Sequence, residues 1–160
     1  MEREIKTIIH AFRNALVMAS DTHSHACFFM PRWHQELNGF PSGSCDLASN
    51  FLARYLTEHG YPAWIIRFSC SHEINKYIKT HVVVKYDDYY IDLTRNQFAD
   101  YNNRVLIEDK YGSIATLLRD VKKDEFLTFK EEDFCIDNAT DSGDQLYCYV
   151  KQLADGLVKK

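Results

Sequence analysis

The 160-residue sequence lacks any run of eighteen uninterrupted apolar residues, so we expect no membrane-spanning helix and no membrane partner. Its start, MEREIKTIIHAFRNALVMAS, lacks the basic residues, long apolar run and small-residue cleavage site of a secretory signal. It also lacks a basic excess, because 19 Lys and Arg face 23 Asp and Glu, giving a formal net charge of −4. This balance argues against a nucleic-acid partner, which usually requires a basic face.

No CxxC pair is present, and the five cysteines are odd in number and irregularly spaced: Cys27, Cys45, Cys70, Cys135 and Cys148. This pattern suits free thiols in a reducing cytosol better than a disulfide framework. We therefore expect a cytoplasmic protein, or an effector delivered without a signal of the usual secretory type. Repeats and low-complexity tracts are absent as well, and the length fits a single domain over residues 1–160.

What the sequence does contain is a clear alternation of helix-like and strand-like segments. Apolar spacing predicts helices over residues 2–19, from about Cys45 to His59, and over 112–121 and 142–157. Strands are predicted over 61–70, in a hairpin over 80–94, and at RVLIED. Residues 21–44 read as a long loop, and DEFLTFKEEDF is ambiguous. N-terminal helices followed by an antiparallel sheet predict the α+β class.

Cys45 draws attention because it follows a flexible Pro-Ser-Gly-Ser run and opens a predicted helix. Ser44 is the candidate N-cap, and Gly60 marks the expected end. Backbone N–H groups and the dipole at a helix start favour a thiolate over a thiol, and can also stabilise an oxyanion on an attacked carbonyl. The alternative is that Cys45 is simply a small apolar residue at the start of a helix.

The hairpin supplies partners for the thiol. Folding about Asp87-Asp88 would place Lys85 opposite Tyr90 and put His81 and Asp92 on one face as diagonal neighbours. The other face would be apolar and would pack on the helices, leaving His81 and Asp92 toward a cleft. An imidazole beside a thiol takes its proton, and a carboxylate on the far ring nitrogen orients the imidazole. Alternatively, each is an ordinary strand residue satisfied by its neighbours.

The stretches GSCDLASNFLARYL and THVVVKYDDYYIDLT resemble the nucleophile helix and the histidine–aspartate hairpin of papain-like and transglutaminase-like cysteine enzymes. Residues 40–64 and 80–98 are more closely similar to small bacterial cysteine-hydrolase-like domains, with Leu93 where proline is common. The resemblance implies a papain/transglutaminase-like fold and a Cys45–His81–Asp92 triad. In that triad Cys45 is the nucleophile, His81 the general base and then acid, and Asp92 the orienter.

Four further residues are weaker candidates for substrate binding or oxyanion support: Ser44, Asp46, Trp33 and Gln97. Asp46 stands where the family frequently has glycine, and its carboxylate would oppose thiolate formation unless it points away. Gln97 fits loop bracing better than substrate contact. Trp33 and Phe40 are expected to form an apolar wall of the cleft.

Two competing constellations rank lower. A zinc set is conceivable from the histidine-rich loop, although finger spacing is absent: His23, His25, Cys27 and His34. Cys70 and His72 form another thiol–imidazole pair, but without a helix start. The triad requires no metal and no organic cofactor.

The function predicted from these patterns is cysteine-dependent acyl transfer at an amide bond of a protein or peptide substrate. Peptidase, amidase or glutamine deamidase activity ranks above amine-transferring transglutaminase activity. A catalytically idle protein-binding module is the alternative from another class, and a toxin or effector would use the same chemistry. Substrate identity, the second oxyanion donor and the oligomeric state are left open by the sequence.

Overall fold

The computed structural model describes residues 1–21, 29–41, 44–69, 80–94, 105–124, 127–135 and 141–159. These residues form a mixed α+β arrangement of helices and a five-stranded antiparallel sheet, which confirms the predicted class. The elements in chain order are α1 (Arg3–Asp21), the π-helical turn η1 (Trp33–Leu37), α3 (Cys45–Glu58), β1 (Ala63–Ser69), β2 (Thr80–Tyr86), β3 (Tyr89–Asp92), β4 (Leu106–Glu108), α4 (Ser113–Lys123), β5 (Phe129–Glu132) and α5 (Asp141–Val158).

The sheet has the strand order β4-β3-β2-β1-β5, with every neighbouring pair antiparallel. In the hairpin, Lys85 lies opposite Tyr90, so the register predicted from the sequence is confirmed. Asp87 opens the turn with a φ of 52°, a left-handed conformation that aspartate tolerates better than most residues. The hairpin therefore fixes which side chains of β2 and β3 share a face.

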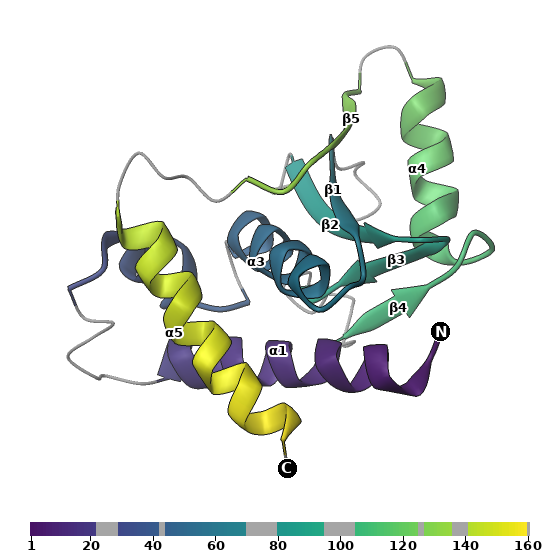
Figure 1. The fold of residues 1–160 in the computed structure, drawn as a ribbon. Helices are drawn as coiled ribbons and strands as arrows, with labels where there is room; N and C mark the ends of the chain where they lie inside the picture. The colour runs from purple at the N-terminus through teal and green to yellow at the C-terminus, as the bar shows by residue number, and fades with distance from the viewer. Residues whose placement is uncertain are drawn as a thin grey trace.

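Helices cover both faces of the sheet (Figure 1). On one face, α1, α3 and α5 enclose the main core together with alternate hairpin residues: Val82, Val84, Ile91 and Leu93. On the other face, α4 packs on a smaller cluster that includes Ile66, Phe68 and Val83. The predicted packing of the apolar hairpin face on helices is thus confirmed. The opposite face differs from the expected open cleft, because α4 and its cluster cover part of it.

Helix α3, which carries Cys45 at its start, ends where the sequence predicts. Gly60 has a φ of +88°, and its N–H donates to the Thr57 carbonyl at 3.1 Å. The N–H of Tyr61 donates to the Leu56 carbonyl at 2.9 Å. This pair of bonds is the Schellman motif, which satisfies carbonyls at a helix end and favours glycine at the left-handed position.

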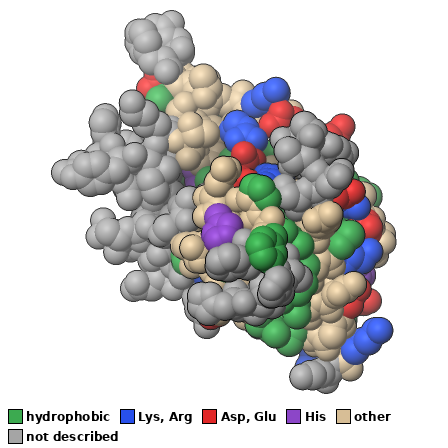
Figure 2. All heavy atoms as spheres, turned by 90° about the vertical axis from the view of Figure 1, so that its left-hand side faces the viewer, with side chains coloured by type: hydrophobic (Ala, Val, Ile, Leu, Met, Phe, Trp, Pro, Cys, Tyr) green, Lys and Arg blue, Asp and Glu red, His purple; other side chains and the backbone are tan. Residues whose placement is uncertain are grey.

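Helix α5 is joined to α3 by charged and aromatic side chains. Arg54 binds the Asp144 carboxylate at 2.8 Å, and its guanidinium lies 4.1 Å from the centre of the Tyr147 ring. The Tyr55 hydroxyl donates to Asp155 at 2.7 Å. Acidic and basic side chains also lie close to one another on the face of the molecule shown in Figure 2. The contacts of Arg54 and Tyr55 hold α3 against α5.

None of the described helices combines the length and the apolar character that a membrane crossing requires.

Candidate active site

His81 on β2 and Asp92 on β3 form a direct pair inside the molecule. The distance from His81 Nε2 to Asp92 Oδ2 is 2.7 Å, and both side chains have 0% of their surface exposed. A slip of one residue in the hairpin would have sent the two side chains to opposite faces. The structure therefore brings together the two residues that the hairpin pattern predicted. It also corrects their exposure, because they are buried rather than displayed in an open cleft.

The second carboxylate oxygen of Asp92 is held by Thr94, two residues further along. Asp92 Oδ1 accepts a hydrogen bond from the Thr94 N–H at 3.0 Å and from the Thr94 hydroxyl at 3.3 Å. This is an Asx turn, the local bond that aspartate forms with the backbone two residues on. Sequence reasoning missed this role of Thr94, although the Asp-x-Thr pattern at a strand end is the signal for it.

Opposing influences act on the protonation of His81. Burial alone would lower its pKa, but the Asp92 charge and hydrogen bond raise it, as does the nearby Cys45 thiol. The balance raises the pKa of His81 to about 9, which favours the imidazolium form of the ring. The rings of Phe68 and His81 pack edge to face, with their centres 5.8 Å apart and their planes at 89°.

Cys45 is the first residue of α3 and is half-buried. Its thiol lies near enough to the His81 ring to contribute to raising the pKa of that ring. Because Asp92 binds Nε2, Nδ1 is the ring nitrogen that a thiolate of Cys45 would use. Ser49, one helical turn after Cys45, donates through its hydroxyl to the Val82 carbonyl at 2.9 Å. That buried bond fixes α3 against the strand that carries His81, and sequence reasoning did not find it.

Ser44 is fully buried and precedes α3, but its side chain makes no capping hydrogen bond to the helix. Its hydroxyl donates instead to the carbonyl of Glu36 in η1. Ser44 is the N-cap residue, as predicted, but its side chain does not cap the helix, because η1 offers a nearby acceptor. Ser44 anchors the entry to α3 and leaves the first-turn N–H groups to other acceptors, as an oxyanion site requires.

Asp46 binds one partner on its own helix and one on the sheet. Its Oδ1 atom accepts hydrogen bonds from Asn50 Nδ2 at 2.7 Å and from Arg67 Nη2 at 3.0 Å. Arg67 comes from β1, so the carboxylate that the sequence places beside the thiol is paired with a cation of the sheet. Sequence reasoning did not find Arg67, since nothing local to RFS marks it as a partner of residue 46.

The expected cleft wall at Trp33 is corrected by the structure. Trp33 is 2% exposed and its indole Nε1–H donates to the Ala19 carbonyl at 2.6 Å, so it anchors η1 to α1 in the core. Phe40 is half-buried beneath the Arg13 guanidinium, 4.9 Å from its ring centre. Cys135 and Cys148 are exposed free thiols.

Several sequence predictions fall outside the described residues. They concern Gln97, the Cys70–His72 pair, and three members of the conceivable zinc set: His23, His25 and Cys27. The fourth member, His34, lies on η1 with its ring 4.8 Å from that of Trp33.

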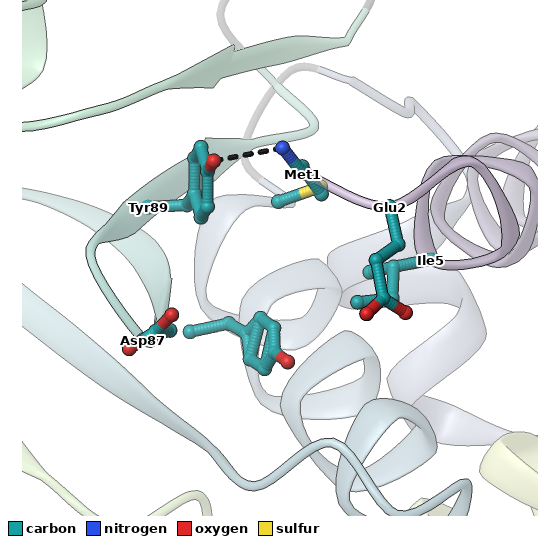
Figure 3. A pocket seen from close by; sticks show the side chains of 6 residues that line it. Met1, Glu2, Ile5, Asp87 and Tyr89 are labelled. Carbon is teal, nitrogen blue, oxygen red and sulfur yellow. Dashed lines mark hydrogen bonds between the residues drawn. The ribbon is translucent and has the colours of Figure 1, made fainter.

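A cavity of about 350 Å³ lies at the turn end of the hairpin (Figure 3). It is lined by Met1, Glu2, Ile5, Tyr86, Asp87 and Tyr89. The α-amino group of Met1 donates to the Tyr89 hydroxyl at 2.7 Å across this cavity. Asp87 is six residues along the hairpin from His81, roughly 20 Å at the rise of an extended strand. This cavity is therefore separate from the triad.

Two curated Escherichia coli proteins, from strains K12 and UTI89 / UPEC, are similar to the chain, and both bear the name "Uncharacterized protein YuaU". Each is 34% identical over 110 residues, which cover 68% of this chain and 48% of the relative. The chain thus spans about half the length of the curated relatives it matches. No protein-family model matches the chain, and no solved structure does.

Proposed function

We propose that the chain is a cysteine-dependent acyl-transfer enzyme that acts on amide bonds through Cys45, His81 and Asp92. The observation that carries this proposal is the buried 2.7 Å bond between His81 and Asp92, on an imidazole whose pKa is also raised by the nearby Cys45 thiol. A nucleophile, a base and an orienting carboxylate connected in this order support nucleophilic catalysis. The papain/transglutaminase-like fold and a cytoplasmic location belong to the same proposal.

The reaction begins with attack of the Cys45 sulfur on the amide carbonyl carbon. The N–H groups at the start of α3 stabilise the oxyanion, and the His81 imidazolium gives its proton to the leaving amine as the C–N bond breaks. The product is a thioester on Cys45 and a neutral His81. The neutral ring then takes a proton from water, whose oxygen attacks the thioester, and the C–S bond breaks to release the acid.

Hydrolysis ranks above amine transfer in this proposal, and the substrate is a protein or peptide. A peptidase, an amidase and a glutamine deamidase share these steps and differ only in which amide occupies the site. An amine that replaces water in the second step would give transglutaminase chemistry. The proposed reaction requires no metal and no organic cofactor.

Selective alkylation tests the proposal. Iodoacetamide at pH 7, followed by mass spectrometry of peptides, should modify Cys45 at least about tenfold faster than the exposed Cys148, because Cys45 lies beside the His81 ring, whose pKa is raised. Cys45→Ala should lose this rapid modification and all amidase activity while retaining the circular dichroism of the fold. Equal alkylation rates at Cys45 and the exposed Cys148 would contradict activation.

A protein-binding module without catalysis is the second candidate, and the complete burial of His81 and Asp92 favours it. Catalysis would require a substrate carbonyl to reach the Cys45 sulfur beside the His81 ring, which has no exposed surface. Partner binding by such a module would survive Cys45→Ala, whereas turnover of a fluorogenic peptide library would not. Turnover by the wild-type chain that Cys45→Ala abolishes rejects this second candidate.

A further inference from the structure

The residue after the proposed nucleophile carries a negative charge that works against the proposed chemistry. A carboxylate beside a sulfur disfavours the thiolate, since two like charges at short range repel. Asp46 occupies this position, and its side chain keeps 46% of its surface exposed, so water screens its charge in part but does not remove it. The structure must therefore either hold the charge away from Cys45 or balance it.

Arg67 is placed to balance that charge. Its Nη2 atom lies 3.0 Å from Asp46 Oδ1, and its Nε atom lies 3.4 Å from Glu132 on β5. Burial would lower the pKa of Arg67, but the hydrogen bond and charge of Asp46, followed by those of Glu132, raise it. The guanidinium is thus a permanent cation shared between the start of α3 and the edge strand.

Arg67 also lies close to the base in the sheet. On β1 it is paired with Val82 of β2, and the adjacent pair along the ladder is Phe68 with His81. A bond from Arg67 to Asp46 therefore ties the residue after the nucleophile to the strand next to the base. Asn50 strengthens the same corner, because its amide donates to Asp46 and its carbonyl oxygen accepts from the Cys135 N–H at 2.8 Å.

We infer that Arg67 is a positioning residue of the proposed enzyme, which pairs with Asp46 to hold its carboxylate off Cys45 and to fix the start of α3 against β1. This inference rests on the proposed function. The charged groups that meet at this corner are Asp46 on α3, Arg67 on β1, and Glu132 and Lys130 on β5, where Lys130 binds Glu132 at 3.0 Å. Of these, only Arg67 binds the carboxylate of Asp46.

A double-variant cycle distinguishes an Arg67 that balances the charge of Asp46 from an Arg67 that only supports the fold. The alkylation rate of Cys45 by iodoacetamide is measured from pH 5 to 9 in the wild type, R67Q, D46N and D46N/R67Q, with Cys148 as the internal reference. R67Q should slow Cys45 about tenfold at pH 7 and move its pH profile upward, because the Asp46 charge is left unbalanced. D46N should accelerate Cys45 about threefold, since Arg67 then acts without an opposing carboxylate.

The double variant decides between the two roles. If Arg67 acts by balancing Asp46, D46N/R67Q should return to within about threefold of the wild-type rate. A double variant as slow as R67Q, or an R67Q profile that does not move, overturns the inference. Should R67Q fail to fold by circular dichroism, D46N alone decides, and a slower Cys45 in D46N overturns the inference.

Arg54→Gln provides a matched control. Arg54 also pairs with an aspartate, Asp144, at 2.8 Å, but it lies nine residues beyond Cys45 on the same helix. Its loss should leave the Cys45 rate unchanged. Failure of the proposed function is distinguishable from failure of this inference, because Cys45 would then react no faster than Cys148 already in the wild type.

Discussion

A single carboxylate, that of Asp92, connects the local turn to the proposed chemistry. One oxygen binds the His81 ring and the other binds the N–H and hydroxyl of Thr94. The two bonds from Thr94 hold the Asp92 carboxylate in place independently of His81. The His81 ring is therefore oriented by a carboxylate whose rotation is restricted. Because all these atoms are buried, the charge of Asp92 acts on His81 with little screening by water.

Asp92→Asn tests the charge while keeping the shape of the side chain. The Asp92 charge is the largest influence that raises the pKa of His81, so D92N should move the NMR titration of the ring well below pH 9. The alkylation rate of Cys45 at pH 7 should fall about tenfold, because less imidazolium faces the sulfur.

Thr94→Val is the matched control for that substitution. It removes only the Thr94 hydroxyl bond and keeps the N–H bond and the Asp92 charge, so the His81 titration should stay near that of the wild type. A His81 ring that titrates at the same pH in D92N and in the wild type would contradict the assignment of Asp92 as orienter.

Helices and hairpin strands were predictable because their signals are local. The turn at Asp87-Asp88 and the alternation on either side set the register, and Gly60 marks the end of α3. Strand β5 was not recognised, since FKEE reads as a charged surface run. It pairs with β1 through its backbone, and its glutamates bind cations of β1 and β2, namely Arg67 and Lys85. An edge strand that pairs through its backbone does not need alternating apolar side chains, so its sequence need not show the usual strand pattern.

Gly60 and Gly156 can test whether the left-handed backbone at the end of α3 requires glycine, because neither site is sterically crowded. A Cβ added at Gly60 or at Gly156 meets no atom within 4 Å, so only backbone conformation distinguishes them. Gly60→Ala should lower the free energy of unfolding by about 1 kcal/mol, because its φ of +88° is costly for alanine. Gly156→Ala, inside α5, should raise it by roughly 0.5–1 kcal/mol. Urea unfolding measures both, and changes of the same sign would contradict the assignment.

The site as a whole depends on contacts that no local pattern encodes. Cys45, His81 and Asp92 could be named from a helix start and a hairpin register. Arg67 could not, because its bond to Asp46 joins positions 21 residues apart and exists only once α3 has docked on the sheet. Trp33 was misread for the same reason, since its partner is the Ala19 carbonyl at the end of another helix. Tertiary docking, rather than composition, decided both.

The buried His81–Asp92 pair also links the stability of the entire fold to pH. The pKa of His81 is raised to about 9 in the folded state, against about 6.5 for an unfolded histidine. A raised pKa adds stability that is fully present below pH 6.5 and is lost as the pH rises through 9. The free energy of unfolding should therefore fall by up to about 3 kcal/mol between pH 6.5 and pH 9.

Urea unfolding at half-unit pH steps measures this fall. The test uses the change of the free energy of unfolding with pH, and not its absolute value. In His81→Gln the slope over this range should largely vanish, whatever the cost of the substitution itself, because the group that binds the proton is gone. D92N should flatten it as well, since the His81 pKa then lies closer to its unfolded value. A wild-type stability that stays constant or rises from pH 6.5 to 9 would mean that His81 is neutral in the fold. The ring would then be unable to serve as the acid that protonates a leaving amine at neutral pH.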